Sequence, residues 1–326
     1  MLLSPDGHAL YVTEPELGRV AILNTKTGKA ICTANIPGQP SLLALSLDTS
    51  VLYVAGEGDS SVRALDPTTC TVQHTFNTNE PVNGLAVAAA VTADATPFTP
   101  NQIWIAGSSG LTIFEASGRL AGRVAIAGGA QYISIPGGFT AYVATQQGSI
   151  VAVDLSTRKV LRTLLSGGQF GPMDFDENTG EIYAPDRQHN QLDVIAPITA
   201  GTTILPKEPA RIFHLSSSPQ SVAITSDGQL GFVALASGQV VMLDIPGRSI
   251  ISSIAVGGTP RFIITGLYPP VASSLPPAPQ TVAVAAGPAN LPLLIVLTVI
   301  LAGILLSGAL WLCWRSYQKR FSNRRS

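Results

Sequence analysis

The chain has 326 residues, of which 46% are hydrophobic and only 12% are charged. A charged share about half that of an average soluble domain fits many buried strands together with one apolar segment near the C-terminus. The formal net charge is −1 and no basic stripe precedes the last dozen residues, so the composition argues against a nucleic-acid partner.

An internal repeat dominates the sequence. The segment SPDGHALYV at residues 4–12 recurs five more times with drift, and each copy has one aromatic anchor. The anchors are Tyr11, Tyr53, Trp104, Tyr142, Tyr183 and Phe232. Intervals of about 40 to 50 residues indicate an array in which each repeat is one supersecondary unit.

The first repeat, residues 1–40, predicts four short strands. Residues 1–3 end an inner strand, residues 9–13 and 19–24 form the next two strands, and residues 29–36 form the outer strand. Turn residues separate the strands, as in a β-propeller blade. The later repeats span residues 41–81, 82–131, 132–172, 173–220 and 221–260, with an insertion at 88–100 and a polar loop at 185–190.

An Asp or Asn ends the third strand of four repeats, at Asn24, Asp66, Asp154 and Asp244. A short acceptor side chain at this position can bind the amides of the following turn. We therefore interpret these residues as structural.

The sequence leaves ring closure open between two accounts. In the first, six four-stranded blades form an all-β propeller, and residues 262–265 supply or overlap the inner strand of the first blade, which removes an unpaired edge. In the second, the natural chain starts further upstream and a seven-bladed propeller is truncated here.

The C-terminal region predicts a membrane anchor. We expect the propeller at residues 1–268, a Pro/Ala-rich linker at 269–290, a transmembrane helix at 291–314 and a basic tail at 315–326. The apolar run is long enough to cross about 30 Å of hydrocarbon. Basic residues follow it directly, so the positive-inside rule puts the C-terminus in the cytoplasm and the propeller outside it.

This orientation requires an export signal, and the residues after Met1 do not have the pattern of one. We expect a start further upstream, which would also explain the short first strand. The alternative is insertion from the C-terminal end, which would leave the propeller inside.

The strand motif resembles a known repeat. SPDGHALYVT at residues 4–13, followed by VAILN at 20–24 and TGK at 27–29, is similar to the YVTN-type β-propeller repeat. The resemblance covers residues 1–266 and implies a propeller fold. Proteins with this repeat include cell-surface proteins, and related lactonase-like propellers include enzymes, so the resemblance does not choose a function.

Candidate binding residues lie in the loops between second and third strands, which share one face of a propeller. They are Glu14, Glu57, Asp59, Asp186, Arg187, His189 and Asn190, with the insertion at 88–100 as a second candidate. Carboxylates meeting near a central channel would suit Ca²⁺, but we favour a solvated loop face with no cofactor. The four histidines have no ligand spacing, and no nucleophile elbow, Cys-x-x-Cys or phosphate loop occurs.

Cys32 and Cys70 lie at different points of their repeats. Their positions leave a disulfide open, but we interpret both as small buried hydrophobic side chains.

We predict a membrane-anchored, non-enzymatic propeller that presents its loop face to a protein or polysaccharide partner outside the cytoplasm. The alternative is a lactonase-like or other hydrolytic propeller with an acidic and histidine site at the channel mouth.

Overall fold

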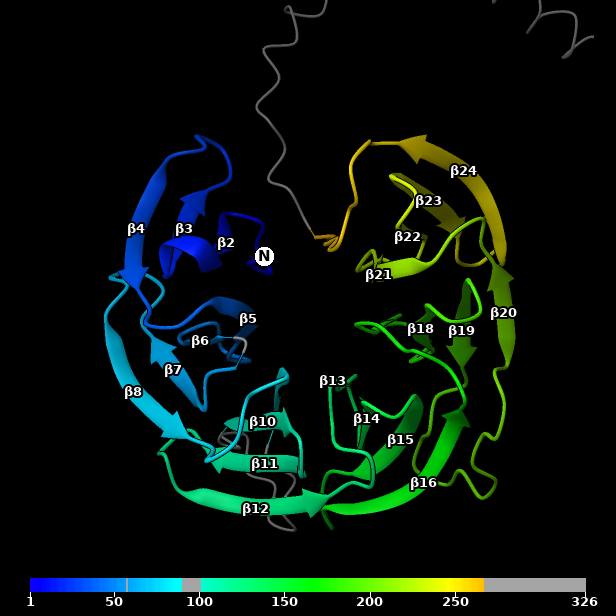
Figure 1. Ribbon diagram of the computed structural model, residues 1–326, viewed down its shortest axis with the longest axis horizontal. Helices are drawn as coiled ribbons and strands as arrows, with labels where there is room; N and C mark the ends of the chain where they lie inside the picture. Colours follow the sequence, from blue (N-terminus) through cyan, green and yellow to red (C-terminus); the bar gives the residue numbers. More distant parts are fainter. Residues whose placement is uncertain (57, 90–100, 267–326) are drawn as a thin grey trace, which may run out of the picture. The chain divides into compact units, whose positions relative to one another are not determined.

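The computed structural model describes residues 1–56, 58–89 and 101–266. These residues form a six-bladed β-propeller in which each blade is a four-stranded antiparallel sheet with strands in chain order (Figure 1). The strand order within each blade agrees with the four-strand pattern of the repeats.

The first three blades contain strands β1 to β12. In blade 1 they are β1 (Leu2–Leu3), β2 (Ala9–Glu14), β3 (Arg19–Asn24) and β4 (Ala30–Asn35), with a 3-10 helix η1 at Pro15–Leu17. In blade 2 they are β5 (Pro40–Leu45), β6 (Leu52–Gly56), β7 (Ser61–Leu65) and β8 (Val72–Asn77). In blade 3 they are β9 (Gly84–Ala89), β10 (Asn101–Gly107), β11 (Gly110–Glu115) and β12 (Leu120–Ala125).

The other three blades contain strands β13 to β24. In blade 4 they are β13 (Tyr132–Ser134), β14 (Thr140–Ala144), β15 (Ser149–Asp154) and β16 (Lys159–Ser166). In blade 5 they are β17 (Asp174–Phe175), β18 (Ile182–Asp186), β19 (Gln191–Ile195) and β20 (Arg211–His214). In blade 6 they are β21 (Pro219–Ile224), β22 (Leu230–Leu235), β23 (Gln239–Asp244) and β24 (Ser249–Ala255).

The turn between the first two strands is held by a repeated side-chain bond. Ser4 Oγ donates to Asp6 at 2.6 Å and accepts the amide of Ala9 at 2.9 Å. Ser46 and Thr225 bind Asp48 and Asp227 in the same way. These bonds satisfy polar groups at the strand ends, which explains why the SPDG-like motif recurs.

The predicted structural role of the strand-ending Asp or Asn is confirmed. In each case the side-chain oxygen accepts a hydrogen bond from a backbone amide two or three residues later, at 2.6 to 2.9 Å. The amides of Thr27, Thr68, Thr157 and Gly247 donate to Asn24, Asp66, Asp154 and Asp244, respectively.

The core lies between neighbouring blades. Five of the six aromatic anchors are buried against apolar side chains of the following blade, as Tyr53 is in a cluster with Ile103 and Ile105 of β10. Trp104, Tyr142 and Tyr183 pack likewise and are fully buried. Phe232 of blade 6 is only partly buried.

The predicted inner strand at residues 262–265 is not formed, because residues 256–266 contain no strand. The segment still lies between the first and last blades: Thr265 Oγ1 donates to the carbonyl of Ile224 in β21 at 2.6 Å, and Gly266 lies against Leu3 of β1. The inner position of blade 1 is instead taken by the short strand β1.

Our interpretation of Cys32 and Cys70 as separate hydrophobic residues is wrong. They form a disulfide with a Cα–Cα distance of 5.9 Å. Cys32 is in β4, and Cys70 is in the turn between β7 and β8, where it has a positive φ of 59°. Because neighbouring blades pack with an offset, residues at different points of two repeats can meet, and the bond joins blade 1 to blade 2.

The predicted transmembrane helix at 291–314, the linker at 269–290 and the tail at 315–326 lie outside the described residues. Within residues 1–56, 58–89 and 101–266, no helix has the length and apolar composition to cross a membrane.

Candidate functional site: the channel-mouth cavity

A cavity of about 740 Å³ lies where the inner strands begin, and we call it the channel-mouth cavity. Blades 2 to 6 each contribute the residue near the start of the inner strand, one position after Pro40, Val82, Ala130, Gly171 or Pro219, and the segment after blade 6 contributes the residue that follows Pro260. The six residues are Ser41, Asn83, Gln131, Pro172, Gln220 and Arg261. Ser41 and Gln220 occupy irregular positions in the strand pairing, where the register shifts by one residue.

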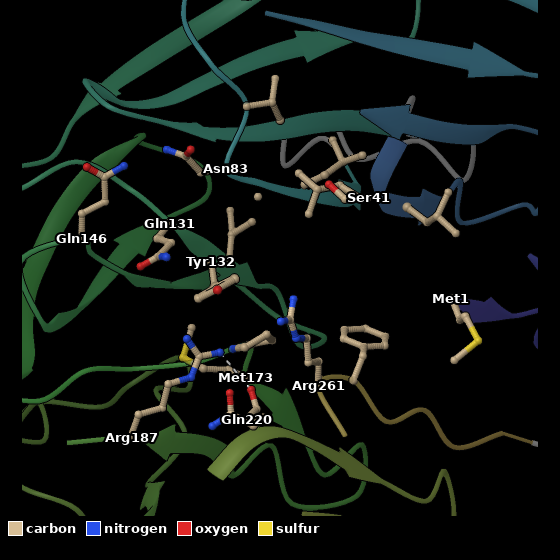
Figure 2. A pocket seen from close by; sticks show the side chains of 18 of the residues that line it. Met1, Ser41, Asn83, Gln131, Tyr132, Gln146, Met173, Arg187, Gln220 and Arg261 are labelled. Atoms are coloured by element: carbon tan, nitrogen blue, oxygen red, sulfur yellow. Dashed lines mark hydrogen bonds between the residues drawn. The ribbon is translucent and has the colours of Figure 1, made fainter. Parts of the chain in front are cut away.

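The cavity wall mixes apolar and polar side chains (Figure 2). Leu42, Val82 and Phe262 are among the apolar residues. Tyr132, Gln146 and Arg187 bring polar groups, the last two from loops between second and third strands. Such a combination of apolar surface and few polar groups is typical of ligand sites.

Asp186 fixes the turn that carries Arg187 to the cavity. Its buried carboxylate accepts the amides of Gln169 at 3.1 Å and Gln188 at 3.0 Å. Its second oxygen lies 2.5 Å from Nδ1 of His189. Asp186 therefore makes hydrogen bonds within the turn and to the connection between β16 and β17. These bonds hold the turn in one conformation without a ligand.

Arg187 extends from this turn into the cavity. Its Nη2 donates to the carbonyl of Gln220 at 3.0 Å, and its guanidinium carbon lies 6.0 Å from the centroid of the Tyr132 ring. A Cβ at Gly171 would stand 3.2 Å from Nη2, so the absence of a side chain there leaves room for the guanidinium.

Two ionisable groups, His189 in the turn and Asp193 in β19, have raised pKa values. Hydrogen bonding to the Asp186 carboxylate raises the pKa of His189. Burial, and next the charge of Asp186, raise the pKa of Asp193 to about 6. The carboxylate of Asp193 accepts a hydrogen bond from Gln191 at 2.8 Å. The side chain of His189 is half exposed and does not line the cavity.

The other predicted binding residues are not brought to this cavity. Glu14 pairs with Arg19 at 2.5 Å and Asp59 pairs with Arg63 at 2.8 Å, each within its own blade. Asn190 has a positive φ of 52°, and its carbonyl accepts the amide of Leu215 at 2.9 Å, so its role in the structure is to shape the turn. Glu57 and the insertion residues 90–100 lie outside the described residues.

Among residues 1–56, 58–89 and 101–266, no three His, Cys, Asp or Glu side chains are grouped as ligands for a metal ion.

Sequence reasoning missed Arg261, Tyr132, Gln131 and Gln220. Gln131 and Gln220 share a position that was visible as the polar residue at the start of an apolar inner strand, Arg261 holds the matching place after blade 6, and Tyr132 is the first residue of β13. Aligning the repeats would have shown that the shared position lines the central channel in successive blades. The polarity of a loop alone does not give that information.

The fold and its central cavity define a six-bladed β-propeller with a candidate ligand site at the channel mouth. Comparison with protein family models and with curated protein sequences finds no match. Solved structures do match. Hydrazine synthase of Kuenenia stuttgartiensis aligns with a TM-score of 0.65 and 14% identity, over 79% of this chain and 86% of that chain.

The β-propeller domain of Cps50 (Swd1) from Myceliophteria thermophila aligns with a TM-score of 0.66 and 13% identity, over 81% of this chain and 87% of that domain. At these identities the similarity establishes the fold alone.

Proposed function

We propose that this protein is a binding module. A propeller held at a membrane by residues 291–314 accepts a segment of a protein partner at its channel mouth, on the extracytoplasmic side. The observation that carries the proposal is the cavity of about 740 Å³, which is preformed by strand entrances and a bonded turn. Rigid scaffolds with binding groups on loops and strand ends are a common arrangement for recognition.

Two features support the extracytoplasmic location. The apolar run at 291–314 is followed by a tail with five basic residues and no acidic residue. The Cys32–Cys70 disulfide favours an oxidising compartment, since cytosolic thiols are generally kept reduced. The strand motif at residues 4–13 also supports kinship with YVTN-type propellers, some of which are cell-surface proteins.

A hydrolytic, lactonase-like propeller is the second candidate, and the contact between His189 and Asp186 favours it. Binding is the better-supported function because both oxygens of Asp186 are used to hold the turn, and Asp193 hydrogen-bonds Gln191. A catalytic site would need these groups to face one reacting atom.

Photo-crosslinking in intact cells tests the proposal. A benzophenone amino acid replaces the exposed Gln188, which lines a neighbouring pocket that shares Gln131 and Gln146 with the channel-mouth cavity. In a matched variant it replaces Ile250 on the outer strand β24. We expect a discrete protein adduct from position 188 and none from position 250. Adducts only from position 250, or from neither position, would contradict the proposal. A heterogeneous smear that glycosidases remove would mean a polysaccharide partner instead.

A further inference from the structure

We propose that the channel-mouth cavity recognises a carboxylate on an apolar body, held between Arg187 and Arg261. The inference rests on the proposed function and adds the chemistry of the ligand. Figure 2 shows both arginine side chains entering the cavity, one from the β18–β19 turn and one from the segment after β24.

The cavity lining has an unbalanced charge. Its described residues include these two arginines and no Asp or Glu. Four other described arginines pair with carboxylates of their own blades: Arg19 with Glu14, Arg63 with Asp59, Arg119 with Glu115 and Arg211 with Glu181. Arg123, Arg158, Arg162 and Arg248 have no ion pair among the described residues, but none of them lines the cavity. Neither cavity arginine has an ion pair within the described residues, so the site attracts an anion.

Arg187 has unused hydrogen-bonding capacity. Its Nη2 binds the carbonyl of Gln220, but its buried Nε has no acceptor among the described residues. Removing a guanidinium from water without a counter-charge is unfavourable, and leaving a donor unpaired adds to the cost. A ligand carboxylate would supply both the missing counter-charge and an acceptor for Nε.

The surroundings orient Arg187 for this task. The Tyr132 ring lies under the guanidinium, and Gly171 leaves space beside it, so the planar group is restricted before binding. Arginine presents a fork of N–H donors that matches the two oxygens of a carboxylate.

The rest of the cavity indicates what carries the carboxylate. Asn83 donates to the carbonyl of Ala130 at 3.0 Å, and Gln220 donates to the carbonyl of Ser218 at 3.2 Å. Their amide groups are therefore partly committed to the scaffold. Leu42, Val82 and Phe262 supply apolar surface, which suits an aliphatic or aromatic body better than a bare inorganic ion.

The test uses the full chain in detergent micelles and ligand-observed NMR titrations. Phenylacetate is the probe, and phenylacetamide is its neutral match. We expect phenylacetate to bind about tenfold more tightly than phenylacetamide, as charge-assisted hydrogen bonds predict. Equal affinities, or no binding of either compound, would overturn the inference without any variant being needed.

Variants locate the site. Replacing both arginines, Arg187→Gln with Arg261→Gln, is expected to weaken phenylacetate binding about tenfold, to the level of the amide. Arg248→Gln, at an exposed arginine in the β23–β24 turn, is the matched control and should bind as the natural protein does. Unchanged affinity in the double variant would place the carboxylate elsewhere and overturn the proposal.

A third arm identifies the source of the carboxylate. Acetyl-Leu-Glu-Leu-amide and its Gln analogue are titrated as competitors of phenylacetate. Tighter binding of the Glu peptide supports an acidic segment of a protein partner, whereas competition by free acids alone supports a small organic acid. Failure of all carboxylates, with crosslinking at position 188 retained, would overturn this inference and leave the proposed function standing.

Discussion

Some polar side chains in this propeller make all their hydrogen bonds within the fold, and others keep a donor without a partner. Asp154 accepts bonds from the hydroxyl of Ser156 and from both the amide and hydroxyl of Thr157, so it shapes a turn. Arg187 has a buried donor with no acceptor in the described residues, so its bonding is completed only by something else. Arg158 and Arg211 also have a buried Nε without an acceptor in the described residues, but neither lines the channel-mouth cavity. Unused bonding capacity together with a place in the cavity wall is what marks Arg187 as a candidate site residue.

Asp174 has a carboxylate inside the fold whose ionisation lowers the free energy of unfolding. Its carboxylate accepts the amide of Ile224 at 2.7 Å, which connects β17 to β21, and burial raises its pKa to about 6. Between pH of about 4 and 6 the folded chain therefore binds more protons here than the unfolded chain. The free energy of unfolding falls as the pH rises through that window.

Asp174→Asn keeps an acceptor oxygen and removes the ionisation. We expect the variant to be more stable than the natural protein above pH 6, by about 1 to 3 kcal/mol, with the difference vanishing below about pH 4. Thermal denaturation from pH 3.5 to 8 checks this. Glu208→Gln, which removes one negative charge at an exposed position, is the matched control. A variant less stable at every pH would mean that the charged acceptor stabilises the fold.

At the scale of elements, blades are joined by apolar clusters and, in one place, by a covalent bond. Tyr11 of blade 1 lies in a cluster with Leu52 and Val54 of blade 2. Cys70 belongs to the same cluster, and Cys32 packs against it. The Cys32–Cys70 disulfide thus joins two blades that also pack against each other through apolar side chains, and it links residues 38 positions apart in the sequence.

Reduction of this disulfide is expected to destabilise the propeller. The chain-entropy estimate for a loop of this length is about 4 kcal/mol, or a fall in melting temperature on the order of 7 °C for a domain of this size. Thermal denaturation with and without dithiothreitol measures the effect. The double variant Cys32→Ser with Cys70→Ser should melt at the reduced temperature and should not respond to dithiothreitol. A natural protein insensitive to dithiothreitol would contradict the prediction.

The repeat spacing predicted the blades because each strand pair is encoded locally, by an alternating pattern and a turn. The SPDG-like turn and the strand-ending Asp residues are such local signals. The disulfide was not predictable in this way, because Cys32 and Cys70 meet only through the packing of one blade against the next. The missing strand at 262–265 has a similar origin, since strand formation there depends on a partner strand and not on apolar character.

The candidate site was predicted only in part, also for a physical reason. Arg187 and the turn around Asp186 stood out as the most polar departure from the repeat. Glu14 and Asp59 were candidates only because they lie in the corresponding loops, and each faces an arginine of its own blade, at Arg19 and Arg63, that neutralises it. Arg261 and Gln220 were hidden because a single polar residue at the start of an apolar segment carries no signal until the repeats are aligned.

At the scale of the whole molecule, the proposed function depends on the proposed membrane anchor and on the side of the membrane that the propeller would then occupy. The disulfide and the basic residues after position 314 favour the same arrangement, with the propeller outside and the C-terminus in the cytoplasm. The carboxylate site would then be open to extracellular ligands, and a charged ligand would not need to cross the bilayer.

Protease protection on intact cells measures this arrangement directly. The gene is expressed with its upstream genomic sequence and an epitope tag after residue 326. We expect external protease to remove the propeller and leave a short tagged fragment, because the positive-inside rule keeps the basic tail in the cytoplasm. A cytoplasmic marker protein, intact throughout, is the control. A propeller that is degraded only after the membrane is breached would face the cytoplasm, and an extracellular partner would then be ruled out.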